Sequence, residues 1–185
     1  RQWLQAEWSG VPRELRGAGE ARWDQQWNRW RERALTVDVE RELERVERAG
    51  GGFITPADPR WPVQLSCLGE EEPLGLWFLG RLSDASQSEG HVSIVGARAS
   101  TSAGGRCARN MAYHLARSGY AIVSGGAIGI DIEAHRGALA GGGRTICVLA
   151  GGVLNPYPAC HTEDFRAIVD RGGLIVSEVA PTARP

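Results

Sequence analysis

The strongest constraint on the fold is an alternation between residues 91 and 177. Short β-branched runs alternate there with helix-length segments, and small residues follow the first three runs. The pattern predicts strands over residues 92–95, 120–123, 145–149 and 174–177, and helices over 104–118, 131–140 and 162–171. Strands joined by such helices pair in parallel through right-handed crossovers. We therefore expect an α/β protein with a Rossmann-like, mostly parallel sheet. Four strands make an incomplete doubly wound sheet, so we expect it to be truncated on its C-terminal side, at Pro185.

Details of two helices follow from residue spacing. Four residues of the first helix repeat at helical spacing and are expected to form its buried face: Ala108, Met111, Ala112 and Leu115. The last helix carries Thr162 at its start, which is expected to act as its N-cap.

The first ninety residues differ from the rest of the chain. Residues 1–50 have a helical pattern, with Trp23, Trp27 and Trp30 on one face. These rings could stack on single-stranded bases, but packing against another helix is the favoured interpretation. Residues 51–90 are predicted to be a connecting segment with two short strands, an edge strand at 53–55 and another at 74–80.

Composition excludes several classes of protein. There is no run of about 18 apolar residues, so we expect no membrane span. The cysteines are far apart and form no Cys-x-x-Cys pair, which predicts reduced thiols in a cytoplasmic protein (Cys67, Cys107, Cys147 and Cys160). The sequence shows no metal-ligand spacing and no dinucleotide or P-loop fingerprint, so no cofactor is expected.

Charge gives a weaker indication. All 21 basic residues are arginine, and the net charge is −1. Residues 91–185 carry nine arginines against six acids, whereas residues 51–90 carry two against six. This distribution is compatible with an anionic partner in one cleft but is no general nucleic-acid footprint.

Candidate binding residues lie in the loops that follow the first two strands. The carboxyl ends of parallel strands meet at one edge, where α/β proteins bind ligands. The first loop, residues 96–101, offers backbone amides, two hydroxyls and the guanidinium of Arg98 at a helix N-terminus. The second loop, residues 124–129, adds further amides and a hydroxyl. Together they predict an anion site, although glycines at strand ends also serve ordinary turns.

Asp131 and His135 stand at i and i+4, so they can share one helix face and touch. They could act as an acid–base couple, or Asp131 could brace the loop while His135 fills a polar niche; the second reading is favoured. No Gly-x-Ser-x-Gly nucleophile elbow occurs. Nothing in the pattern requires catalysis.

A family resemblance rests on four segments in order: IVGARAST, IVSGGAIGIDIEAHRGAL, TICVLAGGV with YP and His161 following, and GGLIVSE. The chain resembles the DNA-processing protein A family (DprA, also called Smf) over residues 53 to 181. The resemblance implies a non-enzymatic cytoplasmic protein without a cofactor. It implies binding to single-stranded DNA, protection of incoming DNA in natural transformation, loading of the RecA recombinase, and a homodimer. Residues 1–50 resemble a remnant of a sterile-alpha-motif-like domain.

The resemblance also implies a set of nucleic-acid-binding positions. They are Gly96, Arg98, Thr101, Ser124, Gly125, Gly126, Ala127, Gly129, Asp131 and His161, with Tyr157 and Pro158 at the pocket edge. The chain departs from the family's usual residues at Ala103, Ile128, Leu154 and Asp164. The alternative hypothesis is a phosphoribohydrolase acting on nucleoside monophosphates on a related fold. Such enzymes carry a Pro-Gly-Gly-x-Gly-Thr-x-x-Glu motif, which is absent here.

Overall fold

The computed structural model describes residues 32, 38–82 and 90–184. The chain divides into two compact units, Arg1–Arg41 and Glu42–Pro185, and the fold below is that of the second. Its hydrophobic core includes a residue that precedes residue 51, because Val46 is fully buried in the main core cluster. The predicted tryptophan face of residues 23–30 lies outside the described residues.

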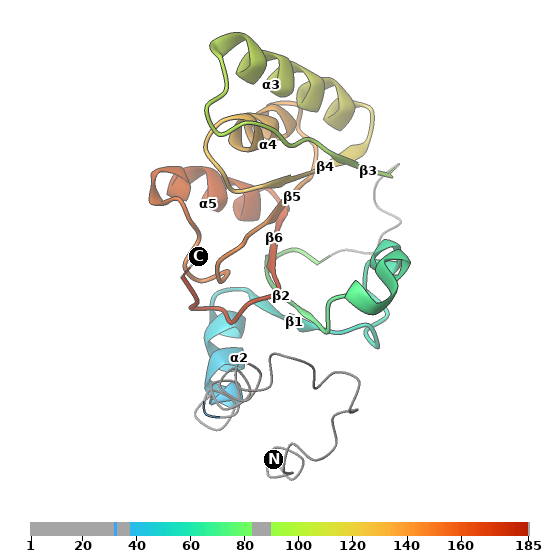
Figure 1. Ribbon diagram of the computed structural model, residues 1–185, viewed down its shortest axis with the longest axis vertical. Helices are drawn as coiled ribbons and strands as arrows, with labels where there is room; N and C mark the ends of the chain where they lie inside the picture. The colour runs from blue at the N-terminus through green and yellow to red at the C-terminus, as the bar shows by residue number, and fades with distance from the viewer. Residues whose placement is uncertain (1–31, 33–37, 83–89, 185) are drawn as a thin grey trace, which may run out of the picture. The chain divides into compact units, whose positions relative to one another are not determined.

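One six-stranded sheet organises the second unit, in the order β1-β2-β6-β5-β4-β3 (Figure 1). The strands are β1 (Gly51–Ile54), β2 (Leu76–Gly80), β3 (Gly90–Ser93), β4 (Tyr120–Gly125), β5 (Thr145–Val148) and β6 (Leu174–Ser177). The four predicted strands pair in parallel, which confirms that expectation. Segment 51–90 adds an antiparallel hairpin to the same sheet, with β1 at its edge as predicted. The first parallel strand starts two residues earlier than expected, because Gly90 pairs with Tyr120.

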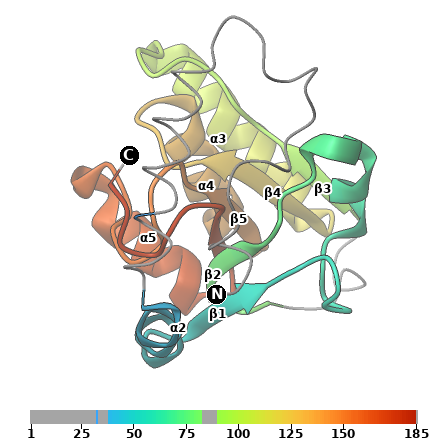
Figure 2. The ribbon, with the colours of Figure 1, turned by 60° about the horizontal axis from the view of Figure 1, so that its bottom comes forward.

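The helices cover one face of the sheet. They are α2 (Val39–Arg48), α3 (Ser102–Arg117), α4 (Ile130–Ala140) and α5 (Thr162–Asp170), close to the predicted ranges (Figure 2). Each crossover from β3 to β6 moves to the next strand in the same direction, so right-handed connections place every helix on one side. The doubly wound arrangement is therefore not seen among the described residues. On the other face, the 3₁₀ segment η4 (Val63–Glu71) follows Trp61, which packs with side chains of β1, β2 and β6.

Small residues bring α3 and α4 together. The buried positions of α3 are Gly105, Ala108, Ala112 and Ala116. A Cβ at Gly137 of α4 would lie 2.2 Å from the carbonyl oxygen of Arg109, so only glycine permits this approach. The prediction that Met111 faces the core is wrong, since its side chain is 51% exposed.

Capping also differs from the sequence expectation. Thr101 caps α3, and its side-chain oxygen accepts a hydrogen bond from the Gly104 amide at 3.1 Å. Thr162 is not the N-cap of α5; its hydroxyl donates to the Ala159 carbonyl in the preceding 3₁₀ turn, η6 (Ala159–His161).

The four cysteines are free thiols, as predicted. Three are exposed, whereas Cys147 of β5 is fully buried, and burial raises the pKa of its thiol. Across the described ranges, no helix combines the length and apolarity needed to cross a membrane. The same ranges contain no cluster of three or more potential metal ligands.

Candidate nucleic-acid interface

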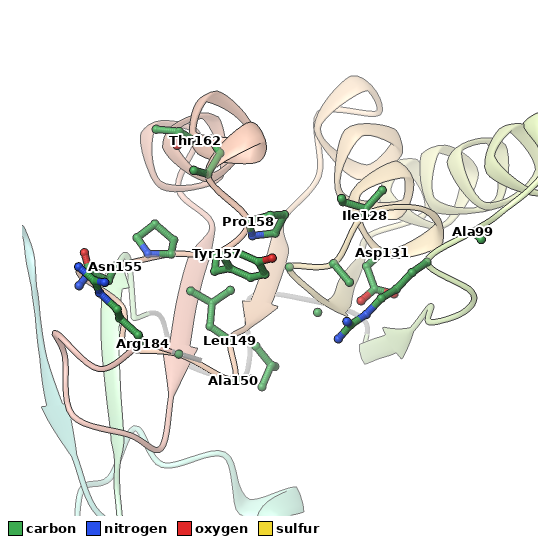
Figure 3. A pocket seen from close by; sticks show the side chains of 18 residues that line it. Ala99, Ile128, Asp131, Leu149, Ala150, Asn155, Tyr157, Pro158, Thr162 and Arg184 are labelled. Atoms are coloured by element: carbon green, nitrogen blue, oxygen red, sulfur yellow. Dashed lines mark hydrogen bonds between the residues drawn. The ribbon is translucent and has the colours of Figure 1, made fainter.

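An open cavity of about 1280 Å³ lies beyond the carboxyl ends of the parallel strands (Figure 3). We call it the carboxyl-end cavity. Its position agrees with the edge that the strand pattern predicted. It is lined by Arg98, Ala99, Gly125, Gly126, Ala127, Ile128, Asp131, Val148, Leu149, Ala150, Gly151, Asn155, Pro156, Tyr157, Pro158, Ala159, Thr162 and Arg184.

Gly129 lets the two predicted loops pack against each other. Its φ of +97° is a conformation that other residues rarely adopt. A Cβ there would lie 2.3 Å from the Ala97 carbonyl oxygen and 2.6 Å from that of Arg98. The Ile130 amide donates to the same Ala97 carbonyl at 3.3 Å. The loop after β3 is therefore held directly beside the loop after β4.

The predicted site residues separate into two groups. Arg98, Gly125, Gly126, Ala127 and Asp131 line the cavity. The other five, Gly96, Thr101, Ser124, Gly129 and His161, do not line it.

The residues outside the lining support the loops. A Cβ at Gly96 would lie 2.8 Å from Cγ1 of Ile130. Ser124 is 2% exposed, and its hydroxyl donates to the Ile94 carbonyl, which ties β4 to the chain after β3. His161 is 6% exposed and lies behind the second loop.

Two arginines give the cavity its positive charge. Arg98 and Arg184 are exposed, and neither forms an ion pair or a side-chain hydrogen bond within the part of the chain that the structure describes. Arg184 lies on the Asn155 side of the cavity, away from Asp131 (Figure 3). Two unpaired guanidiniums facing one open space can bind phosphate oxygens.

Asp131 is the acidic member of the lining. It is 9% exposed, and among the described residues its carboxylate has no hydrogen-bond or ion-pair partner. A Cβ at Gly125 would lie 2.6 Å from Asp131 Oδ2, so a larger residue there would have to displace this carboxylate. Arg98 and Asp131 both line the cavity but form no ion pair with each other. An unpaired carboxylate in the cavity suits ligand groups that donate hydrogen bonds.

His135 is fully buried and does not line the cavity, so it has no access to a substrate there. Its ring nitrogens bond to Thr145 Oγ1 (2.7 Å, from Nδ1) and the Gly125 carbonyl (2.9 Å, from Nε2). It makes no hydrogen bond with Asp131, and its two hydrogen bonds in a buried site agree with the polar-niche interpretation. Burial lowers the pKa of His135, although the nearby Asp131 charge opposes this shift.

An ionic network joins the three helices behind the loops. Arg136 of α4 donates two hydrogen bonds of 2.8 Å to Asp164 of α5 and one of 2.9 Å to Glu133. Arg109 of α3 donates to the other oxygen of Glu133 at 2.6 Å. Burial raises the pKa of Glu133, but the two arginines outweigh it, and the net pKa is lowered. The network fixes the first turns of α4 and α5, which adjoin the cavity.

The sequence pattern did not identify Asn155 or Arg184 as lining residues, and it placed Tyr157 only at the pocket edge. Tyr157, noted at the pocket edge, is 62% exposed and lies between Leu149 and Pro158 in the view of the cavity (Figure 3). Arg184 follows the last strand, in a segment without periodicity. Asn155 fixes that segment by donating from Nδ2 to the Thr182 carbonyl at 3.0 Å. Only the rule that ligands lie beyond strand carboxyl ends could have pointed to Arg184.

These features define an α/β protein with an open, arginine-bearing cavity at the carboxyl ends of its parallel strands. The family model described as "DNA recombination-mediator protein A" matches residues 52–185. The chain belongs to this family, which confirms the DprA/Smf resemblance.

Individual relatives agree with the family. A Mycobacterium tuberculosis protein that bears the DprA name is 41% identical over 156 residues, which cover 78% of this chain and 39% of that protein. The structure of DNA processing protein A from Streptococcus pneumoniae matches with a TM-score of 0.68 and 28% identity, over 83% of this chain and 52% of that one. A structure from Helicobacter pylori, titled for the single-stranded DNA binding mode of DNA processing protein A, matches with a TM-score of 0.55 and 27% identity, over 73% and 58%. The chain thus spans well under half of the length of that Mycobacterium relative.

Proposed function

We propose that this chain binds single-stranded DNA in the carboxyl-end cavity, as part of a protein that processes DNA during transformation and recombination. One observation carries the proposal: an exposed aromatic ring, Tyr157, shares the cavity with two unpaired arginines, Arg98 and Arg184. An aromatic ring can stack on an unpaired base, and arginines can bind the phosphates that flank it. The structure from Helicobacter pylori is titled for single-stranded DNA binding, which supports the same ligand for this chain.

The proposed ligand is single-stranded because stacking on Tyr157 needs an exposed base face. In a duplex that face is covered by the neighbouring base pairs. Asp131 adds a hydrogen-bond acceptor that a base N–H can reach and that a bare phosphate would avoid. We therefore expect a nucleotide unit, with base and phosphate, to fit the cavity better than an isolated anion.

The wider role is also a proposal. We infer a non-enzymatic, cytoplasmic protein that acts as a homodimer, protects incoming single strands and passes them to the RecA recombinase. The family membership supports this role. The described residues form the carboxyl-end cavity, and the recombinase contact and dimer surface are inferred from the family.

The test is a comparison of oligo-dT with a duplex of equal length at matched salt. We expect tighter binding of oligo-dT, with a log–log salt slope of about −0.7 for each phosphate engaged. Tyr157→Leu should weaken oligo-dT binding by about 1–3 kcal/mol. Tyr120→Leu is the matched control, since Tyr120 begins β4 at the opposite end of the strand. Equal affinity for single strand and duplex would contradict the proposal.

The phosphoribohydrolase alternative retains one supporting observation, the unpaired Asp131 carboxylate in the cavity. Incubation with nucleoside monophosphates tests it directly. Release of free base, lost in Asp131→Asn, would favour an enzyme over a binding protein.

A further inference from the structure

Asp131 is a buried carboxylate that faces the carboxyl-end cavity without a partner in the described part of the chain. Its side chain is 9% exposed, and it takes part in no hydrogen bond or ion pair there. Among the described residues, the fully enclosed side-chain atoms that lack a partner belong to Glu42 and Arg144. The Asp131 oxygens are therefore still accessible from the cavity that they line. Such a carboxylate has lost most of its water, and a ligand that donates hydrogen bonds would compensate for that loss.

The surface next to this carboxylate is apolar. Asp131 Oδ2 lies 2.6 Å from the position that a Cβ of Gly125 would occupy. Gly125 pairs with Val148 in the register of β4 and β5, and neighbouring strands lie about 4.8 Å apart. Val148 is 47% exposed and lines the cavity, and so does Ile128, which is 53% exposed and lies beside Asp131 (Figure 3). A flat ring can therefore lie against apolar side chains while one of its edges meets the carboxylate.

The two sides of the cavity carry opposite charges. Asp131 lies on one side, and Arg184 lies on the other, beside Asn155 (Figure 3). Tyr157 lies between them in this view and is 62% exposed. A nucleotide has its groups in the same order, because hydrogen-bond donors lie on the edge of the base, the planar ring follows, and the phosphate is anionic. This order places the base, rather than the phosphate, against Asp131.

The four DNA bases differ in what they present to a carboxylate, which only accepts hydrogen bonds. Guanine carries its N1–H and its N2 amino group side by side, so it can donate two parallel hydrogen bonds to the two carboxylate oxygens. Thymine has a single N3–H between two carbonyl oxygens. Adenine and cytosine each place a ring-nitrogen acceptor next to their amino group. In these three bases, an acceptor would face one of the carboxylate oxygens and repel it.

We infer that Asp131 is a specificity-determining residue of the carboxyl-end cavity, and that its carboxylate selects guanine over the other bases. Two matched hydrogen bonds of this kind favour the correct base by roughly tenfold. The assignment of this guanine to a DNA strand rests on the proposed function. A free guanine nucleotide offers the same groups, and the experiments below distinguish the two sources.

The first measurement changes the ligand and leaves the 185-residue chain unaltered. Short dT strands are compared by fluorescence anisotropy, with thymine, guanine, hypoxanthine or 7-deazaguanine as the central base. Hypoxanthine retains N1–H but lacks the amino group, whereas 7-deazaguanine retains both donors and loses only N7. We expect the guanine and 7-deazaguanine strands to bind about tenfold more tightly than the thymine strand, and hypoxanthine to lose most of this gain. Equal affinity for the guanine and hypoxanthine strands would overturn the inference.

The second measurement changes the carboxylate. Asp131→Asn keeps the size of the side chain but replaces one acceptor oxygen by a donor NH₂ group. The ratio of guanine affinity to hypoxanthine affinity should therefore fall to about one. Asp170→Asn is the matched control and should keep the ratio of the unaltered chain, because Asp170 is an exposed acid at the end of α5 that does not line the cavity. An unchanged ratio in Asp131→Asn would overturn the role of Asp131. If this variant does not fold, the base series on the unaltered chain decides the question.

Mononucleotides separate this inference from the proposed function. If dT strands bind but a central guanine adds no affinity, the inference fails and the proposed function stands. If no single strand binds, but an NMR titration shows tighter binding of dGMP than of dIMP, the proposed function fails. Guanine recognition then stands, with a free nucleotide as the ligand. If neither strands nor dGMP bind, both proposals fail.

Discussion

Replacement of Arg98 by alanine is the most direct test of the proposed interface. Arg98 is exposed, lines the carboxyl-end cavity and has no ion-pair partner within the described ranges. A charge-assisted hydrogen bond to phosphate contributes about 1.5–3 kcal/mol, and solvent exposure favours the lower end. We therefore expect a loss of about 1.5 kcal/mol, roughly tenfold in affinity for oligo-dT. Arg98→Lys should recover part of this loss, because the charge returns without the bidentate fork.

Thermal stability provides the second half of the same test. Because Arg98 makes no described ion pair, Arg98→Ala should change the free energy of unfolding by less than about 0.5 kcal/mol. The matched control is Arg106→Ala, since Arg106 is an exposed arginine of α3 that does not line the cavity. Binding is measured by fluorescence anisotropy at one fixed salt concentration, and the midpoint of thermal unfolding by circular dichroism. Equal losses of affinity in both variants would refute the reasoning, because general electrostatics would then explain the effect. A destabilised Arg98→Ala protein with unchanged affinity would remove Arg98 from the interface.

Three further predictions concern groups near the cavity. Arg136→Ala should destabilise the fold by about 1–3 kcal/mol in urea unfolding, because half-buried Asp164 loses its arginine donor and Glu133 keeps only Arg109. The exposed pair of Arg166 should contribute under about 0.5 kcal/mol. The folded-state pKa of His135 is below its unfolded value near 6.5, so only the unfolded chain gains this proton as the pH falls below about 6.5. Stability should then fall with acidification by up to about 1.4 kcal/mol per pH unit, and His135→Gln should flatten that slope. Asp131→Asn should tighten inorganic phosphate binding by about 1 kcal/mol, by removing a nearby negative charge; weaker oligo-dT binding in the same variant would instead show that Asp131 accepts from a base.

Periodicity predicted the parallel part of the sheet well because its strands and helices bury continuous apolar faces. The strand 145–149 and the helix 131–140 differ from β5 and α4 by one residue at one end. The errors arise where tertiary contacts override local pattern. Met111 fits the apolar rhythm of α3, but α4 approaches so closely that only alanine and glycine fit between the helices.

The candidate site was predicted in part, for a similar reason. Loop composition identified Arg98 and the glycines of the second loop, since small residues at strand ends allow close backbone approach. Loop composition does not distinguish a residue that faces the cavity from one that supports it. Ser124 and His161 are polar residues in the right segments, yet both are buried behind the lining. Arg184 reaches the cavity only because the chain after β6 folds back beside Asn155.

The reactivity of the four cysteine thiols can report local opening of the sheet. Cys67, Cys107 and Cys160 are exposed and should react with a thiol reagent within the first kinetic phase. Cys147 lies at the centre of the sheet with a raised pKa, so it should react only when β5 separates from its neighbours. The slow phase of labelling therefore measures the free energy of that opening under native conditions. The absence of lysine also helps labelling experiments, since amine-directed dyes can attach only at the chain's α-amino group and do not modify the two arginines of the cavity.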